Sequence, residues 1–314
     1  MLFSRSFFSV LLFSALVTGC PAQAQDFIPN PTSLTAREGM FTLDTQTRVY
    51  TNLQGSDLKF IKSYLGQTLS LKDFGAKPGD GRGVLRLVCT GTAAEAAKAI
   101  DDASLQGYTL DVTPQAVTIE AVTPMGVFYG IQSVRHLLTD GRRMQCTHIV
   151  DQPRFTYRGL MLDCSRHFWP LDYLKRQVDA LAYFKMDRLH LHLTDGGGWR
   201  LEIKKYPRLT AEAAYRTCSS WKDWWDTSSN RKYCHKGDEG AYGGYYTQKE
   251  MRELVRYAAE RHITIIPEIE MPGHSDEVTA AYPELSCSAS PIPRAIFVWA
   301  TSRRLLSLRM YCAK

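Results

Sequence analysis

The stretch RLHLHLTDGGGW, from Arg188 to Trp199, decides the expected fold. Leucine and histidine alternate along it, Asp195 closes the alternating run, and three glycines follow. Alternation predicts an extended strand, because successive side chains of a strand point to opposite faces. The sequence therefore predicts a strand that carries an acid at its carboxyl end, followed by glycines that allow a sharp turn and leave room for a ligand.

The same arrangement of a short apolar strand closed by an acid occurs on both sides of this stretch. GLMLD ends on Asp163, and ITIIPEIE ends on Glu270. Amphipathic helical patterns lie between the strands, at residues 170–184 and 247–262. Alternating strands and helices predict a parallel sheet, either open and doubly wound or closed as a (β/α)8 barrel. In both folds the carboxyl ends of the strands form the site, so we expect Asp163, Asp195 and Glu270 to lie at a pocket.

Residues 26–150 have a different pattern. Several β-branched stretches predict strands, and the helical pattern that begins at Thr123 and Pro124 has a capping residue followed by proline at the first helical position. The sequence predicts a small α+β domain here, which packs against the parallel sheet and carries no chemistry of its own.

Composition places the chain among ordinary globular proteins, with 44% hydrophobic and 22% charged residues in 314. The formal net charge of +6 comes mainly from residues 289–314, which hold five Lys or Arg and no Asp or Glu. The remainder is almost neutral, which argues against nucleic acid as a partner.

The first 25 residues predict a secretory signal peptide. Arg5 precedes an apolar run, and Cys20 follows that run directly, as in a lipoprotein signal; Ala22-Gln23-Ala24 offers an ordinary cleavage site instead. We expect an exported protein, periplasmic or anchored in the outer membrane through a lipid on Cys20. No later segment is apolar enough to predict a membrane span.

Cys218 and Cys234 flank a polar segment and are predicted to pair, because an exported protein can form disulfides; two free thiols are the alternative. No Cys-x-x-Cys or Cys/His cluster predicts a zinc site.

Three long motifs in register carry a family resemblance: RGLMLDCSRHFWP, HLHLTDGGGWRLEIKKYPRL and IPEIEMPGHS. With them the chain, from about Asp26 to Ser286, closely resembles the bacterial β-N-acetylhexosaminidases of glycoside hydrolase family 20. The resemblance implies a TIM barrel, here incomplete, with the first three βα units at residues 151–288 and an N-terminal hexosaminidase-type domain at 26–150.

The resemblance also implies an activity and residue roles. Such enzymes release terminal N-acetylglucosamine or N-acetylgalactosamine from glycans with retention, and the substrate's own acetamido oxygen is the nucleophile. Arg158 would bind sugar hydroxyls, and Asp195 with His274 would form the hydrogen-bonded pair that supports the acid. N-acetylhexosamine-containing glycans are the implied partners, and no cofactor is implied.

Two departures from the family pattern stand out. Asp195 is followed by three glycines where the family often has Asp-Gln-Gly, and the His-x-Gly-Gly-Asp-Glu motif that supplies the acid is absent. The pairs Asp238-Glu239 and Asp276-Glu277 are poor substitutes, since the first lies in an inserted loop and the second begins a helix.

The last residues carry a further expectation. Residues 289–314 form a basic tail unlike the family, for which we hypothesise a frameshift or a truncated gene. Three strands cannot close a barrel, so we expect an inactive chain that aggregates through exposed strand edges.

Two alternatives remain open. His190 and His192 with His274 and an acid could hold a metal in a metal-dependent hydrolase, although a regular strand would place Asp195 on the opposite face from the histidines. Without that role, the histidines would fill the layer between helix and sheet. Trp221, Trp224 and Trp225 could stack on sugars in a non-catalytic glycan-binding surface protein, or could pin their loop to its own domain.

Overall fold

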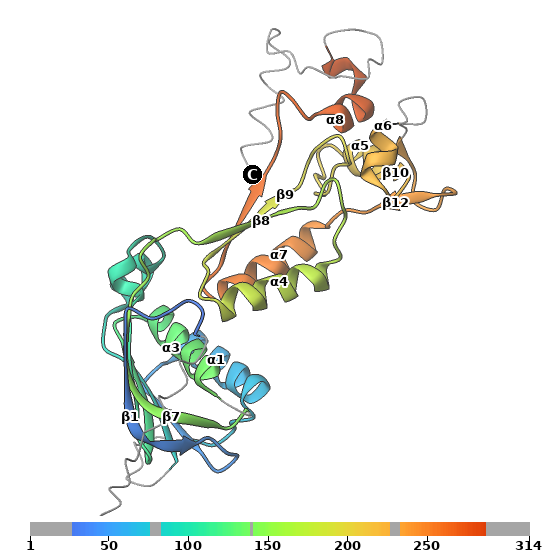
Figure 1. Cartoon of the computed structure of the whole chain (residues 1–314). Coiled ribbons are helices and arrows are strands. Elements are labelled where there is room, and N and C mark those ends of the chain that lie inside the picture. Colours follow the sequence, from blue (N-terminus) through green and yellow to red (C-terminus); the bar gives the residue numbers. More distant parts are fainter. Residues whose placement is uncertain (1–26, 76–82, 139–140, 227–232, 287–314) are drawn as a thin grey trace, which may run out of the picture.

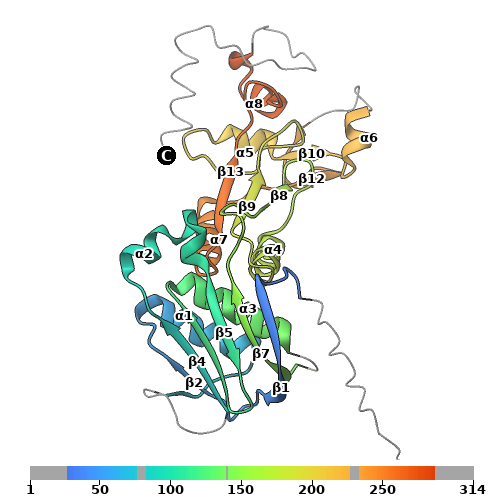
Figure 2. The ribbon, with the colours of Figure 1, turned by 60° about the vertical axis from the view of Figure 1, so that its left-hand side comes forward.

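The computed structural model describes residues 27–75, 83–138, 141–226 and 233–286, which form an N-terminal domain joined to a second α/β unit (Figures 1 and 2). The predicted signal peptide with Cys20 and the tail at 289–314 lie outside the described residues. Among the helices that are described, none combines the length and the apolar character needed to cross a membrane.

The N-terminal domain is built on a seven-stranded mixed sheet of order β1-β7-β5-β6-β4-β2-β3. Its strands are β1 (Ser33–Thr42), β2 (Arg48–Thr51), β3 (Phe74–Gly75), β4 (Val84–Cys89), β5 (Tyr108–Val112), β6 (Ala116–Ala121) and β7 (Arg143–Asp151). Helices α1 (Gly55–Thr68) and α3 (Pro124–Leu137) lie on one face of the sheet, and the short α2 (Ala93–Lys98) lies at the end near the second unit (Figure 2). This is the α+β domain that the sequence predicts.

Helix α3 forms where its capping residues predict it. The Thr123 hydroxyl accepts a hydrogen bond from the Gly126 amide at 3.3 Å, and Pro124 occupies the first helical turn. The helix is buried on nearly all sides, and Gly130 packs so closely on Ile119 of β6 that a methyl group there would meet it at 2.4 Å. Burial of this kind supplies most of the stability that a helix of this length lacks on its own.

The second unit contains a three-stranded parallel sheet of order β13-β9-β8. Strands β8 (Gly159–Asp163), β9 (Arg188–His192) and β13 (Thr264–Glu268) alternate with helices α4 (Leu171–Tyr183) and α7 (Gln248–Ala259). The two helices lie side by side on one face of the sheet (Figure 1), where Leu189 and Leu191 are fully buried. The predicted parallel sheet of three βα units is therefore confirmed.

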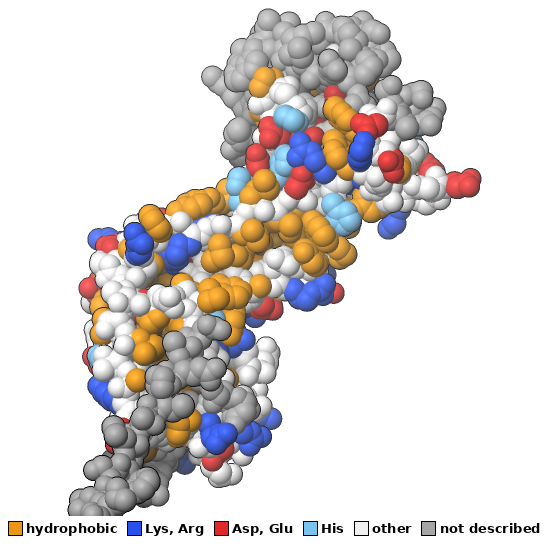
Figure 3. Space-filling model, in the orientation of Figure 1, with side chains coloured by type: hydrophobic (Ala, Val, Ile, Leu, Met, Phe, Trp, Pro, Cys, Tyr) orange, Lys and Arg blue, Asp and Glu red, His pale blue; other side chains and the backbone are white. Residues whose placement is uncertain are grey.

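Both outer edges of this sheet and part of its other face are uncovered in the described part of the chain, although His192 on that face is buried. Each outer strand pairs only with β9 there, and Met161 on β8 is 54% exposed. Figure 3 shows hydrophobic side chains gathered across this middle region, with charged and histidine side chains beyond one end of the strands. Unpaired parallel edges and an exposed inner face are what an open part of a (β/α)8 barrel presents.

A long insertion between β9 and α7 forms a small lobe of its own. It contains α5 (Arg208–Ala213), α6 (Trp221–Asp226) and the antiparallel strands β10 (Tyr215–Thr217), β11 (Tyr233–Cys234) and β12 (Ala241–Gly243); α8 (Asp276–Ala281) packs against α5.

The predicted pairing of Cys218 with Cys234 is not found in this lobe, and both thiols are free. Cys234 lies opposite Tyr215 in the β10–β11 register, three residues from Cys218. At about 3.4 Å per residue the offset is about 10 Å, beyond the reach of a disulfide.

The N-terminal domain packs against the amino ends of the barrel strands. Helices α4 and α7 are each followed within three residues by a residue in the left-handed conformation, Lys185 (φ 58°) and His262 (φ 58°). Both side chains lie against the N-terminal domain. The Lys185 ammonium donates to Asp151 Oδ2 at 2.8 Å and to the Tyr108 hydroxyl at 2.7 Å. The two helix ends therefore anchor the second unit on the first.

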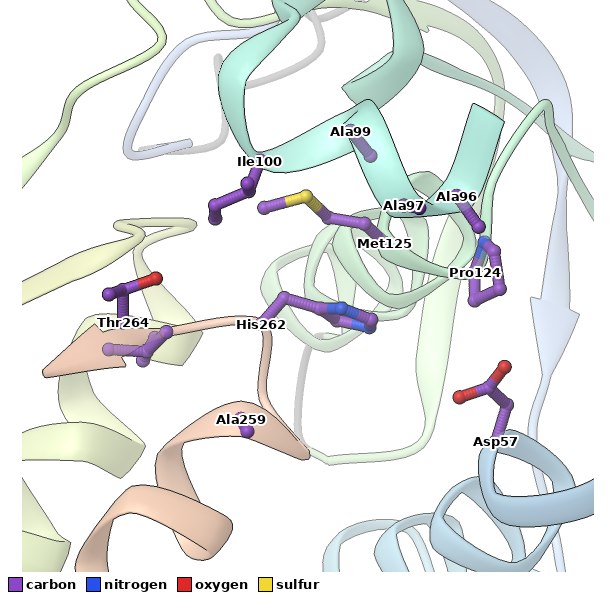
Figure 4. A pocket seen from close by; sticks show the side chains of 11 residues that line it. Asp57, Ala96, Ala97, Ala99, Ile100, Pro124, Met125, Ala259, His262 and Thr264 are labelled. Atoms are coloured by element: carbon purple, nitrogen blue, oxygen red, sulfur yellow. The ribbon is translucent and has the colours of Figure 1, made fainter. Parts of the chain in front are cut away.

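His262 also lines a cavity of about 400 Å³ between the two parts (Figure 4). Met125 and Pro124 of the N-terminal domain line it on one side, and Asp57 of α1 lies beyond the imidazole. Burial lowers the pKa of His262 to about 4. The cavity lies at the amino ends of the strands, the end that carries stability rather than catalysis in barrel folds.

Candidate active site

Asp195 is the centre of a charged cluster at the carboxyl ends of the parallel strands. Its side chain is 3% exposed. Its Oδ2 atom lies 2.6 Å from Arg166 Nη2 and 2.9 Å from His274 Nδ1. The structure thus brings together Asp195 and His274, as the sequence resemblance implies. The two residues are 79 positions apart in the sequence, but the strands that precede them, β9 and β13, are neighbours in the sheet.

His274 reaches Asp195 from a turn with unusual backbone geometry. Its φ of 50° is in the left-handed region, which a residue with a side chain seldom adopts. The imidazole is 59% exposed, whereas the carboxylate that it contacts is buried. In this pair the carboxylate is therefore buried in the protein, and the imidazole is accessible to an incoming molecule.

The strand does not stay regular as far as Asp195, which corrects one expectation. Strand β9 ends at His192, three residues before the acid, and the chain then turns. As a result His192 Nε2 lies 3.7 Å from Asp195 Oδ2. The expected separation of Asp195 and the histidine onto opposite faces is wrong, because the alternation rule applies only while the backbone stays extended.

Arg166 is a site residue that the sequence reading did not single out. Its guanidinium bridges two strand ends, with Nη1 at 2.7 Å from Asp163 Oδ2 and Nη2 at 2.6 Å from Asp195 Oδ2. Burial raises the pKa of Asp163, but interactions with His192 and Arg166 outweigh that effect and hold it well below its usual range. Burial raises the pKa of Asp195, and Arg166, His274 and His192 oppose the rise. A second arginine in the motif RGLMLDCSRHFWP, three residues after a strand-terminal acid, was the available signal.

Arg158 lies elsewhere. It precedes β8, at the amino end of the sheet, about 16 Å of strand away from Asp163. Its guanidinium donates to Gln106 Oε1 and to the Tyr129 hydroxyl, both at 2.9 Å, and contacts Asp187 at 3.1 Å. The structure therefore does not bring Arg158 to Asp195 and His274. Arg158 ties β8 to the N-terminal domain, and Arg166 is the arginine that contacts Asp195.

The glycines after Asp195 serve packing more than ligand space. A methyl group on Gly197 would lie 2.8 Å from the Ser165 carbonyl oxygen and 2.9 Å from Arg166 Cα. Gly198 has φ 143°, and a methyl group there would meet the Arg200 guanidinium at 2.7 Å. The expected room for a ligand is filled by the backbone that carries Arg166, so the glycines hold this arginine close to Asp195.

Two buried arginines fasten the surrounding loops. Arg200 is 0% exposed and donates to the carbonyl oxygens of five residues, namely Cys164, Ser165, Gly197, Ala214 and Gly244. Arg216, also 0% exposed, donates to the carbonyl oxygens of Arg166, Gly197, Cys218 and Ser219. By these charge-assisted hydrogen bonds, both arginines join the segment at residues 164–166 to the turn at Gly197.

Neither alternative carboxyl pair is placed for proton donation. Asp238 and Glu239 are exposed in the insertion, and Asp238 Oδ2 accepts a hydrogen bond from the His235 amide. Glu277, in α8, is fully buried; neither of its carboxylate oxygens has a hydrogen-bond partner among the described residues, and burial raises its pKa well above the usual value. Its carboxyl group is therefore not exposed to a glycan in this structure.

The tryptophans of the insertion divide into two groups. Trp224 is 2% exposed and packs on Tyr233, so it pins the loop. Trp221 lies beside the site, with the Arg166 guanidinium 5.7 Å from its ring, and Trp225 is 41% exposed. Trp221 and Trp225 therefore place aromatic rings next to the charged cluster.

Comparison with known proteins gives the family. The model of the glycosyl hydrolase family 20 catalytic domain matches residues 155–309, and that of domain 2 of the same family matches residues 24–152. The chain belongs to glycosyl hydrolase family 20. The catalytic-domain match includes most of the segment at 289–314 that was expected to be unlike the family.

Relatives and solved structures agree with this membership. The chain is 35% identical to a beta-hexosaminidase of Porphyromonas gingivalis over 83% of its own length, and 36% identical to one of Vibrio furnissii over 84%. It spans 32% and 40% of these two proteins. Its structure resembles an exo beta-N-acetylglucosaminidase of Vibrio harveyi, solved with N-acetylglucosamine, with a TM-score of 0.73 and 27% identity over 91% of this chain and 44% of that one. The family TIM barrel with a preceding domain confirms the predicted fold class.

Proposed function

We propose that this chain carries the sugar-binding and acid-supporting part of a β-N-acetylhexosaminidase site, for substrate-assisted, retaining release of terminal N-acetylglucosamine or N-acetylgalactosamine. The contact of buried Asp195 with Arg166 at 2.6 Å and His274 at 2.9 Å carries this proposal. Such a cluster at the carboxyl ends of barrel strands is where barrel enzymes place their chemistry.

Each residue has a chemical task in this proposal. The planar guanidinium of Arg166 offers a fork of donors, a good match for neighbouring sugar hydroxyls, and its 32% exposure leaves donors free to reach them. Asp195 orients the imidazole of His274 through the contact of its Oδ2 atom with Nδ1 at 2.9 Å. The exposed ring of His274 would then support an acid on the substrate side.

The acid itself is the part that this chain lacks in the described residues. Asp238 and Glu239 lie exposed in the insertion, and the Glu277 side chain is fully buried. Loss of a general acid costs about 10²- to 10⁴-fold in rate. We therefore propose that the chain binds an N-acetylhexosamine but does not turn it over.

The test has two parts, both on the purified full chain. Titration with N-acetylglucosamine, followed by tryptophan fluorescence because Trp221 adjoins Arg166, should give saturable binding, and glucose, which lacks the acetamido group, should bind more weakly. Asp195→Asn should weaken binding, while Asp238→Asn, a matched change at an exposed site, should leave it unchanged. Equal binding of both sugars would contradict the sugar-binding proposal.

Incubation with an aryl N-acetyl-β-glucosaminide should give no saturable turnover. Turnover that is abolished by Asp195→Asn would contradict the proposed lack of an acid. Binding without turnover also fits a glycan-binding surface protein, which Trp221 and the 41% exposed Trp225 favour. Binding to a longer chitin oligosaccharide that falls on Trp225→Ala would extend the surface beyond one sugar.

The same proposal extends to location. The N-terminal sequence, with Arg5, an apolar run and Cys20, supports export to the periplasm and a lipid anchor in the outer membrane. Radiolabelled palmitate incorporated into the wild-type chain, but not into Cys20→Ala, would be the expected result.

A further inference from the structure

We propose that His192, Glu268 and Glu270 form a binding site for a divalent transition-metal ion of the zinc class on the inner face of β9 and β13. Their ligand atoms all lie within 4.8 Å of one another. Metal binding here is independent of the proposed glycosidase function, since it can be measured without any sugar.

The sheet itself places these three side chains together. His192 and Glu268 are direct partners in the parallel β9–β13 register, so they project from the same face. Glu270 lies two residues beyond the end of β13, and its amide donates to Thr194 Oγ1 at 2.8 Å. Two of the three ligands therefore come from adjacent strands, and the third lies just past the end of β13.

His192 has an imidazole nitrogen that is directed into this cluster and is not satisfied. Its side chain is 6% exposed, and Nε2 is a buried atom with no hydrogen-bond partner among the described residues. Glu270 Oε1 lies 3.5 Å from it, outside good hydrogen-bond geometry. Burying a polar atom without a partner is costly, and an ion at this point would supply the missing partner.

The other nitrogen of the ring, Nδ1, lies beside Asp163 and Arg166. His192 Nδ1 lies 3.6 Å from Asp163 Oδ2, and the nearby Arg166 Nη1 already donates to the same carboxylate at 2.7 Å. Arg166 Nη1 also lies 3.4 Å from His192 Nδ1. In the tautomer that carries its proton on Nδ1, that proton faces Asp163 and the Nε2 lone pair is left for a ligand bond. A carboxylate behind the imidazole is the common arrangement around zinc-bound histidine.

The charge around the site favours a cation. Four carboxylates surround His192, those of Asp163, Asp195, Glu268 and Glu270. The guanidinium of Arg166 contacts two of them, Asp163 and Asp195. The local excess of negative charge is lowered by a dication. One imidazole and two carboxylates suit zinc and similar ions, whereas magnesium and calcium prefer oxygen ligands alone.

The carboxylates can adjust to a metal ion. In a tetrahedral site with bonds of about 2.1 Å, ligand atoms lie about 3.4 Å apart, close to the 3.5 Å between His192 Nε2 and Glu270 Oε1. Glu268 is 33% exposed and can rotate closer, and its Oε2 atom contacts His190 at 2.8 Å, so that histidine would orient it.

Isothermal titration of the purified full chain with zinc chloride tests the proposal, and cobalt(II) absorption reports the geometry. We expect one ion per chain with a tetrahedral cobalt spectrum. Glu270→Gln and Glu268→Gln should each weaken binding about tenfold or more. Both are nearly isosteric changes at partly exposed side chains, so folding should be retained, as far-UV circular dichroism can check.

Two control variants separate this site from other ligands. His235→Gln changes an exposed imidazole that lies 3.7 Å from Asp238, and Cys218→Ser removes a partly exposed thiol; neither should alter the stoichiometry or the affinity. The proposal is overturned if zinc does not bind at micromolar concentration, or if both Glu variants bind it as the wild type does. Loss of binding in Cys218→Ser alone would also overturn it.

Discussion

Replacing Arg200 by methionine should unfold the second unit at a much lower denaturant concentration, because this arginine holds five backbone carbonyls at once. Burial lowers its pKa to about 10, so it stays charged at neutral pH. Methionine retains most of the side-chain volume but donates no hydrogen bond, so the carbonyls around Ser165, Gly197 and Gly244 lose a partner.

The expected magnitude follows from the number of bonds lost. Each unsatisfied buried carbonyl costs about 1 kcal/mol after local relaxation, which gives about 5 kcal/mol for all five. The variant also avoids the cost of burying a charge, so the net loss of unfolding free energy is about 3 to 5 kcal/mol. With a urea dependence of about 2 kcal/mol per molar, the midpoint should fall by about 2 M.

The positions of the tryptophans provide the assay. All six lie at residues 169, 199, 221, 224, 225 and 299, and none lies in the N-terminal domain, so fluorescence follows the second unit. Arg252→Met, at an exposed position of α7, is the matched control and should shift the midpoint by less than about 0.3 M. Arg200→Lys keeps the charge with fewer donors and should give about half the effect. Equal midpoints for Arg200→Met and Arg252→Met would refute the reasoning.

Other predictions concern single features. The pKa of His262 is about 4 in the folded chain and about 6.5 when unfolded, so its contribution to stability is present above pH 6.5 and is lost as the pH falls toward 4. The loss is at most about 3 kcal/mol, and His262→Gln should flatten the dependence of the urea midpoint on pH. Gly197→Ala should cost about 2 kcal/mol or more and weaken sugar binding by displacing Arg166, whereas Gly273→Ala, with open space around it, should do neither. Thr247→Ala removes both hydrogen bonds of a capping box and should lower the unfolding free energy by about 1 kcal/mol.

Local signals in the sequence predicted the elements well. The sequence predicted the capping residues of α3 and α7, the three parallel strands and the apolar faces of α4 and α7, and each of these features depends on residues close together in the chain. Such patterns follow from helical and extended periodicity, so they need no knowledge of distant contacts. The contact between Asp195 and His274 was also expected, but it came from the family resemblance.

The sequence by itself determined an α+β domain followed by parallel strands that alternate with helices. Only the tertiary structure decided which side chains meet. It placed Arg158 at the domain interface and Arg166 at the site, turned Asp195 back toward His192, kept Cys218 and Cys234 apart, and packed the glycines against Arg166 and Arg200. The physical reason is that periodicity fixes the face on which a residue lies only within a regular element, whereas these residues lie just beyond strand ends, where long-range packing sets the path of the chain.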